Sequence, residues 1–243
     1  YKLEPATATI TAKKVLDGKA LEAGKYTFKL TEVGGNNVEH QATNDANGNI
    51  KFPEINYDKE GTYTYKLTEV AGNEAGVTYD SAEHTVTVTV TENNAKLEAA
   101  VTDNNPTFTN SYKDYGVSYE FLSSNPAYPN LPKEVTDLLP ADTNRYTSGT
   151  NVDARQPAKT SVTVTEGTWT FEGYAETNAQ TVADKDLKFT GKWNFTPAPK
   201  YKVTYEFVSA DPNRALPAEV TELLPTDANE YTDGTAVQGV QPA

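Results

Sequence analysis

Short segments of alternating apolar and polar residues dominate the first 113 positions of the chain. Such alternation places every second side chain on the same face and is typical of a half-buried β-strand. It occurs at Tyr26–Leu30, Tyr63–Leu67 and Val86–Val90, and turn signals are present at Leu16–Gly18 and Asn47–Gly48. Several short strands with turns between them predict a β-sandwich.

The rest of the chain contains an internal repeat. Leu131–Ala158 aligns without gaps to Leu216–Ala243, with 18 of 28 positions identical, and Val117–Phe121 recurs as Val203–Phe207. The period of 85 to 86 residues exceeds a solenoid unit, so we expect each copy to be a domain. The predicted domains are residues 1–113, 114–198 and 199–243.

Each complete copy is predicted to be a small α+β domain. In Leu131–Leu139 the apolar residues have helical spacing, and Pro140 ends the predicted helix. Strands are expected at Ser161–Thr165, Trp169–Phe171 and Phe189–Phe195. The predicted fold class is therefore mainly β, with an N-terminal sandwich followed by α+β repeat domains.

The last copy is expected to be a partial domain. It stops at Ala243 and has no counterpart of Thr160–Phe195, which includes both tryptophans of the preceding copy. Without those strands its helix and first strand cannot be properly buried. We interpret this end as a cut through an array of repeats.

Composition restricts the classes of function. Asp and Glu total 34 against 21 Lys and Arg, a net charge of −13, which disfavours nucleic acid and anionic membranes as partners. The absence of Cys excludes disulfides, thiolate zinc sites and thiol catalysis, and two dispersed histidines, His40 and His84, leave little for a metal site or a serine triad. No apolar run approaches the roughly 18 residues of a membrane span. We expect no cofactor, no metal site and no enzymatic turnover.

Three polar residues fall on the apolar faces of predicted strands. They are Lys14, Glu69 and Asn110. Their apolar neighbours on the same faces are Ala12, Leu16, Tyr65, Leu67, Phe108 and Tyr112. Because an unpaired buried charge is very costly, the residues require an explanation. They could be frayed strand ends, or a buried Lys–Glu pair hydrogen-bonded to the amide, or a reactive group.

The reactive interpretation is a covalent cross-link between side chains. Desolvation lowers the pKa of an amine and raises that of a carboxyl group. A neutral Lys14 amine is a nucleophile, while a protonated Glu69 can donate to the Asn110 carbonyl and shuttle protons. Attack of Lys14 on Asn110 expels ammonia and leaves an amide bond. The reaction occurs once per molecule, and Lys13 is the alternative amine.

Five segments of the first 113 residues carry a family resemblance. They are Ala12–Gly18, Gly24–Leu30, Gly61–Glu69, Val77–Asp80 and Phe108–Tyr112. In this order they resemble the pilin isopeptide-linkage domain of streptococcal major pilins and related Gram-positive surface proteins. The resemblance implies an intramolecular isopeptide bond between Lys14 and Asn110, with Glu69 as the proton shuttle.

The repeats resemble a second family, the SHIRT domains (streptococcal high-identity repeats in tandem). The segments that carry this resemblance are Gln156–Ala158, Gly167–Tyr174, Phe189–Phe195, Tyr201–Phe207 and Leu216–Val220. The resemblance implies a monomeric, rod-like stalk of an extracellular, cell-wall-anchored adhesin, whose other parts contact a host-cell or bacterial surface ligand. The repeats contain no matching Lys, Glu and Asn trio, so no cross-link is predicted there.

A second function and two local motifs compete with the stalk interpretation. A ligand-binding adhesin domain that recognises host glycan or protein is the second hypothesis, although no pocket is evident in the sequence. Asn44–Asn49 weakly resembles a calcium loop, but Asn47–Gly48 is a favourable hairpin turn. The aromatic residues of Trp169–Phe171 and Trp193–Phe195 could form a carbohydrate platform, but alternating large aromatics are typical of a core.

Overall fold

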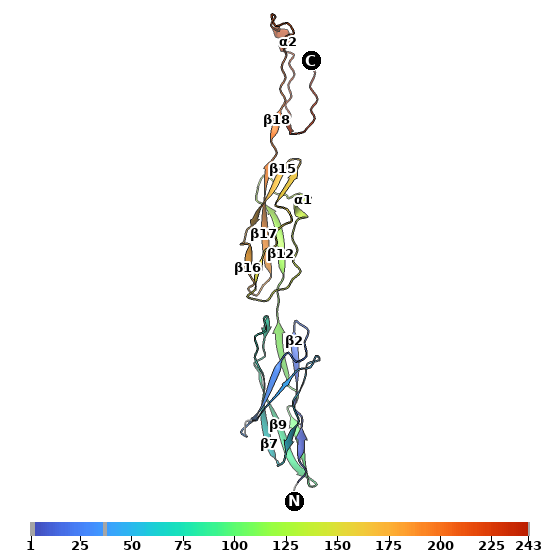
Figure 1. Ribbon diagram of the computed structural model, residues 1–243, viewed down its shortest axis with the longest axis vertical. Coiled ribbons are helices and arrows are strands. Elements are labelled where there is room, and N and C mark those ends of the chain that lie inside the picture. The colour runs from blue at the N-terminus through green and yellow to red at the C-terminus, as the bar shows by residue number, and fades with distance from the viewer. Residues whose placement is uncertain (1–2, 36–37, 243) are drawn as a thin grey trace. The chain divides into compact units, whose positions relative to one another are not determined.

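The computed structural model describes residues 3–35 and 38–242, and the chain is mostly β, with 46% strand and 3% helix. The chain forms two compact units (Figure 1). The first comprises Tyr1–Tyr115 with Arg145–Thr150 and Val182–Lys185, and the second comprises the remaining segments. The predicted fold class is confirmed.

The first unit contains a five-stranded sheet and a four-stranded sheet. The strands of the larger sheet are β3 (Thr27–Val33), β4 (Glu39–Thr43), β7 (Gly61–Glu69), β9 (Glu83–Asn93) and β10 (Lys96–Thr102), in the order β10-β9-β7-β3-β4. Those of the smaller sheet are β2 (Thr11–Asp17), β5 (Asn49–Lys51), β8 (Val77–Thr78) and β11 (Thr107–Tyr112), in the order β5-β2-β11-β8. A separate pair joins β1 (Ala6–Ala8) to β6 (Ile55–Tyr57).

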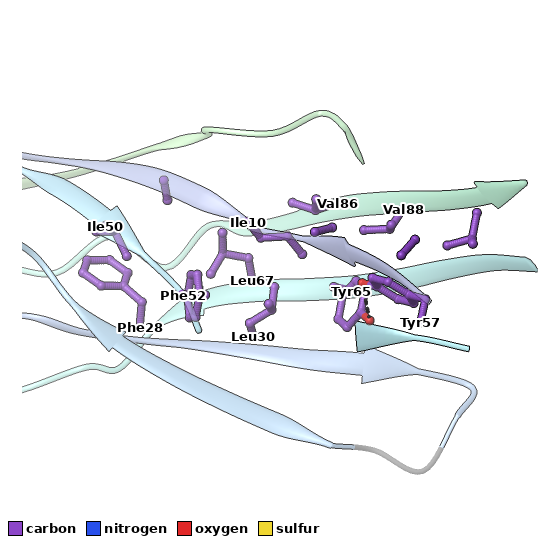
Figure 2. Close-up of a cluster of buried hydrophobic side chains, with 14 of the residues drawn as sticks. Ile10, Phe28, Leu30, Ile50, Phe52, Tyr57, Tyr65, Leu67, Val86 and Val88 are labelled. Atoms are coloured by element: carbon purple, nitrogen blue, oxygen red, sulfur yellow. Dashed lines mark hydrogen bonds between the residues drawn. The ribbon is translucent and has the colours of Figure 1, made fainter. Parts of the chain in front are cut away.

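Both sheets contribute to one core, which makes the unit a sandwich. The apolar face of the larger sheet supplies Phe28, Leu30 and Leu67, and the smaller sheet supplies Ile50 and other side chains, all buried (Figure 2). Side chains alternate between the two faces of a strand, so the period-two pattern of the sequence becomes one buried face per sheet. At one part of this core the Tyr57 and Tyr65 hydroxyls are 2.9 Å apart and hydrogen-bonded, which satisfies both polar atoms.

The first and last long strands of this sandwich are neighbours. β2 and β11 pair in parallel, with Phe108 opposite Lys14 and Asn110 opposite Leu16. The other named strand pairs that the structure describes in this unit are antiparallel. The parallel pairing brings together segments almost a hundred residues apart in the sequence, which hairpins alone cannot do.

The second unit is built on another four-stranded sheet. Its strands are β12 (Val117–Ser123), β14 (Ser161–Val164), β15 (Gly167–Tyr174) and β17 (Leu187–Pro197), in the order β12-β17-β15-β14. A smaller pair joins β13 (Asn151–Asp153) to β16 (Ala179–Thr181). Trp169, Trp193 and Phe195 are buried in one cluster with Val135. These aromatic residues therefore form a core and not an exposed carbohydrate platform.

The predicted helix at Leu131–Leu139 is shorter in the structure. α1 spans Lys133–Thr136, and the amides of Leu138 and Leu139 continue with hydrogen bonds to the carbonyl three residues earlier. Pro140 disfavours the helical conformation of the residue before it, which explains why the helix tightens and ends. Val135 is fully buried as the spacing predicted, whereas Leu139 is 43% exposed. No described helix has the length and apolarity needed to cross a membrane.

The second copy of the repeat has little regular structure. It contains β18 (Lys200–Lys202), α2 (Ala218–Thr221) and β19 (Glu230–Thr232), and α2 has no buried residue. Val203–Phe207, the counterpart of Val117–Phe121, is not in a strand. β12 is held by parallel pairing with β17, and residues 199–243 contain no counterpart of β17. Val208 is consequently 77% exposed.

Candidate functional site

Three strands of the first unit place the polar trio in one buried cluster. Lys14 comes from β2, Asn110 from the adjacent β11, and Glu69 from the end of β7 in the opposite sheet. Lys14 is 1% exposed, Asn110 0% and Glu69 9%. None of them is a frayed strand end, so that interpretation of the sequence pattern is wrong.

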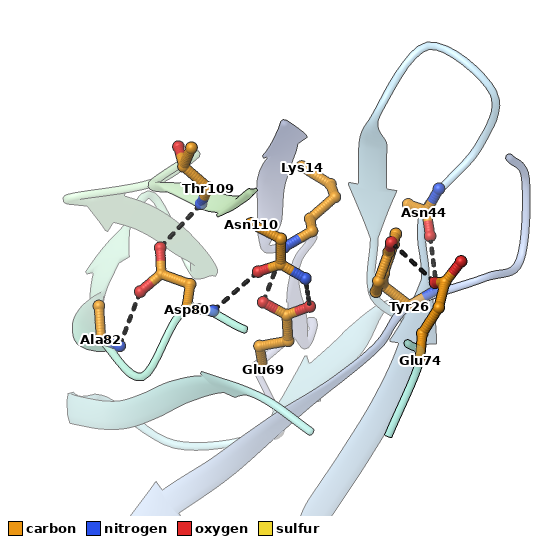
Figure 3. Close-up of polar contacts among 9 residues, drawn as sticks. All are labelled: Lys14, Tyr26, Asn44, Glu69, Glu74, Asp80, Ala82, Thr109 and Asn110. Carbon is orange, nitrogen blue, oxygen red and sulfur yellow. Dashed lines mark hydrogen bonds and ion pairs between the residues drawn. The ribbon is translucent and has the colours of Figure 1, made fainter. Parts of the chain in front are cut away.

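The Glu69 carboxylate lies between the other two side chains. Its Oε2 accepts from Lys14 Nζ at 2.7 Å, and its Oε1 accepts from Asn110 Nδ2 at 2.8 Å (Figure 3). The side chains of Lys14 and Glu69 are both fully shielded from solvent. One carboxylate therefore contacts both the amine that could act as a nucleophile and the amide nitrogen that would leave.

The Asn110 carbonyl has a different partner from the one predicted. Its Oδ1 accepts from the backbone N–H of Asp80 at 2.7 Å, and not from Glu69. Because a backbone N–H can only donate, the carbonyl oxygen must face Asp80 and the amide nitrogen must face Glu69. The structure thus assigns the two ends of this amide to two different groups.

Aromatic rings surround the Lys14 amine. Nζ lies 4.9 Å from the centre of the Tyr26 ring and 5.8 Å from that of Phe28. Burial lowers the pKa of Lys14 below its ordinary value, although the hydrogen bond and charge of Glu69 and the charge of Asp80 act in the opposite direction. A lowered pKa increases the fraction of neutral amine, which is the nucleophilic form.

Lys13, the alternative amine, lies on the other face of β2. Its Nζ donates to the Asn47 carbonyl at 2.6 Å and to Asn49 Oδ1 at 3.1 Å, and Asn49 Nδ2 donates to Asp45 Oδ2 at 2.9 Å. These contacts are exposed to solvent. The surface therefore carries a second lysine, asparagine and acid in contact, but without the burial that would neutralise the amine.

Asn44–Asn49, the segment that weakly resembles a calcium loop, is closed by its own hydrogen bonds. Asp45 Oδ1 accepts from the amides of Asn47 and Asn49, both at 2.8 Å. Gly48 has a φ of +80°, and a Cβ there would lie 2.1 Å from the Lys14 carbonyl oxygen, so the turn requires glycine. Within residues 3–35 and 38–242 no group of three or more acidic or His side chains is arranged to hold a metal.

Asp80 belongs to this cluster, but the alternation of apolar and polar residues does not identify it. It ends the Val77–Asp80 segment and does not follow the strand-parity rule, because it lies in the loop after β8. Its residue type could have indicated a role as a hydrogen-bond acceptor, since Asp in a turn commonly accepts hydrogen bonds from nearby backbone amides. Its side chain does so here, from Ala82 N at 2.8 Å and Thr109 N at 2.7 Å.

Two family models match the chain. A family model described as the Spy0128-like isopeptide containing domain matches residues 10–113, and the SHIRT domain model matches residues 113–196 and 199–243. No curated protein sequence matches the chain.

Solved structures similar to the chain come from streptococci. SHIRT domains 3–4 of a streptococcal cell surface protein are 43% identical, covering 53% of this chain and 76% of that one, with a TM-score of 0.40. SHIRT domain 10 is 39% identical, covering 35% and 99%, with a TM-score of 0.33. The major pilin from Streptococcus pyogenes is 16% identical, covering 77% and 98%, with a TM-score of 0.44. The chain belongs to the SHIRT domain family and carries a Spy0128-like isopeptide-containing domain before its repeats.

Proposed function

We propose that this chain is a structural stalk segment of a bacterial cell-surface adhesin, and that an isopeptide bond between Lys14 and Asn110 closes its first unit. The observation that carries the proposal is the bridging position of Glu69, which contacts the amine and the amide nitrogen at 2.7 and 2.8 Å inside a buried core. The similarity to SHIRT domains of a streptococcal cell surface protein supports an extracellular location.

The bond forms by attack of Lys14 on the Asn110 side chain. Glu69 Oε2 accepts a proton from the Lys14 ammonium, and the neutral Nζ then attacks Asn110 Cγ. As the Cγ–Nδ2 bond breaks, the Glu69 carboxyl group passes this proton to the departing nitrogen, which leaves as ammonia. The second proton lost by Nζ is taken up by the Glu69 carboxylate or leaves with ammonia as ammonium. No oxidant, metal or external reactant is needed.

Burial favours both the reaction and its product. Two opposite charges kept in an apolar core carry a desolvation cost of several kcal/mol each, which their attraction only partly offsets. The cross-linked state replaces the lysine charge with a neutral amide and leaves Glu69 able to hold a proton. Lys13, whose contacts are with solvent-exposed groups, lacks this driving force.

The position of the bond supports a role in carrying tension. Lys14 and Asn110 lie in β2 and β11, the parallel strands nearest to the two ends of residues 10–113. A pull applied to these ends would be transmitted through the covalent bond before it reaches the hydrogen bonds of either sheet. The SHIRT repeats that follow would add length to the segment, and the whole would act without enzymatic turnover.

Intact-mass spectrometry tests the cross-link directly. The wild-type chain is expected to be lighter than its sequence mass by one ammonia molecule, and Lys14→Ala, Glu69→Ala and Asn110→Ala are each expected to have the full mass of their sequence. Lys13→Ala is the matched control and should keep the deficit, because Lys13 is on the outer face of β2. A wild-type chain with no deficit would overturn the proposal.

The lowered pKa of Lys14 predicts how an uncross-linked unit responds to pH. In Asn110→Ala the amine stays free, and its folded pKa is below the unfolded value of about 10.4. Between these two values the unfolded state binds more protons, so the free energy of unfolding should rise with pH across that interval.

Urea unfolding at several pH values measures this effect. The control replaces Lys14, Glu69 and Asn110 together by Met, Gln and Ala, which removes both ionisable groups of the cluster. The rise with pH should be smaller in that variant. An equal slope in the two chains would show that Lys14 has an ordinary pKa in the folded state.

A further inference from the structure

Asp80 ties a loop to the strand that carries the reacting amide. β8 pairs with β11 only at Ser111 and Tyr112, so the edge of β11 at Thr109 is left open by that strand. Asp80 occupies this edge two residues after β8. Its Oδ2 accepts from Thr109 N at 2.7 Å, and its own N–H donates to Asn110 Oδ1 at 2.7 Å (Figure 3).

The carboxylate of Asp80 is held on both sides. While Oδ2 contacts Thr109, Oδ1 accepts from Ala82 N at 2.8 Å, within the same loop. Although burial raises the pKa of Asp80, these two amide hydrogen bonds and the charge of Lys14 outweigh that effect and keep the pKa below its ordinary value. The side chain therefore remains ionised at neutral pH and can accept both hydrogen bonds.

We propose that Asp80 is a positioning residue for the cross-linking reaction, its carboxylate fixing its own backbone N–H against the carbonyl oxygen of Asn110. This inference rests on the proposed function. When Lys14 Nζ attacks Cγ, negative charge develops on Asn110 Oδ1. A donor already placed at 2.7 Å stabilises that charge without any rearrangement.

The charge of Asp80 would act in the opposite direction. Its negative charge raises the pKa of Lys14, which keeps more of the amine in the protonated, unreactive form. If charge were the only role of Asp80, its removal would accelerate cross-linking. If its hydrogen bonds hold the donor in place, its removal slows cross-linking. The sign of the effect separates the two roles.

Whether removal of Asp80 speeds or slows cross-linking can be measured from the rate of bond formation in the full chain. The chain is made by cell-free synthesis, samples are quenched in acidic denaturant, and the fraction that has lost ammonia is followed by intact mass. Asp80→Ala is expected to slow the reaction at least about tenfold, since removal of one donor to a developing oxyanion commonly costs a hundredfold or more. Asp80→Asn, which keeps one carbonyl acceptor, should be intermediate.

Glu83→Gln is the matched control for this experiment. Glu83 lies three residues after Asp80 and forms an exposed ion pair with Lys66, so its removal takes away a nearby negative charge without touching the amide. It should cross-link at the wild-type rate. Protease resistance of parallel samples gives the folded fraction, so that the rate is compared among folded chains. Asp80 variants that react at the wild-type rate or faster would overturn the inference.

A second measurement does not depend on the Asp80 variants folding. In Lys14→Met the Asn110 amide cannot react, and hydrogen exchange of the Asp80 N–H should be at least tenfold slower than in Lys14→Met with Asn110→Ala. Equal exchange in these two chains would show that the donor is not held by the carbonyl.

The inference and the proposed function fail in different ways. A wild-type chain without the loss of ammonia overturns both. A cross-linked wild type whose Asp80 variants react equally fast overturns only the role of Asp80.

Discussion

Under a stretching force, the wild-type chain is expected to keep residues 14–110 folded or looped, whereas the Asn110→Ala chain is expected to release them. The bond would close a loop of about 96 residues, and a chain of that length extends by about 330 Å when it is pulled straight. In the wild type the proposed bond would block this extension, because the force would pass from β2 to β11 through a covalent bond and not through the hydrogen bonds between these strands.

Single-molecule force spectroscopy of the full chain would measure this difference. The Asn110→Ala trace should contain one additional unfolding event, with a length gain of about 330 Å less the end-to-end distance of the folded unit. Lys13→Ala retains the buried trio and should give the wild-type trace. If wild type and Asn110→Ala show the same events, the bond does not carry the load.

The second large effect concerns stability. Closing a loop of about 96 residues lowers the entropy of the unfolded chain, and by analogy with a disulfide it contributes about 4–5 kcal/mol to the free energy of unfolding. Asn110→Ala also leaves the Asp80 N–H without its partner, the Asn110 carbonyl, which adds about 1–3 kcal/mol for a buried polar group. Lys14→Ala and Glu69→Ala remove different local contacts, but both should also lose the stabilisation that closing the loop provides.

The positions of the tryptophans provide an internal control for this measurement. The two tryptophans of the chain, Trp169 and Trp193, both lie in the second unit. In a denaturant titration, tryptophan fluorescence should therefore report a transition that the three variants leave unchanged. Far-UV circular dichroism, which reports both units, should show a second transition moved to lower denaturant by each variant. Variants within about 1 kcal/mol of the wild type would contradict a covalent closure.

Side-chain parity made part of this site readable from the sequence. Along a strand every second residue faces the core, so Lys14, Glu69 and Asn110 could be placed inside from their apolar neighbours alone, and all three are buried. His84, which shares the parity of Val86 and Val88 in β9, has its ring edge-on to that of Phe108, with the ring centres 4.9 Å apart. Because parity depends only on local backbone geometry, it predicts which side chains are buried without knowledge of the fold.

The partners of each buried group were not available from that rule. The expectation that Glu69 donates to the Asn110 carbonyl was wrong in its geometry, because the Asp80 N–H occupies that oxygen. Asp80 reaches it from a loop, where no periodic pattern applies. The helix predicted in the first repeat was also too long. The apolar spacing continues to Leu138 and Leu139, but Pro140 disfavours the α-helical conformation just before it, and α1 ends at Thr136.

Residue types and their period are enough to predict a mainly β chain with a repeat, in which one unit buries an amine, a carboxyl and an amide. These properties are local. The contacts among the three groups come from the fold, in which β2 and β11 lie side by side in parallel, Glu69 from the opposite sheet bridges their side chains, and the Asp80 N–H donates to the carbonyl. Those contacts join residues 29 to 94 positions apart, and strand pairing across such distances is set by how the sheets close around a common core.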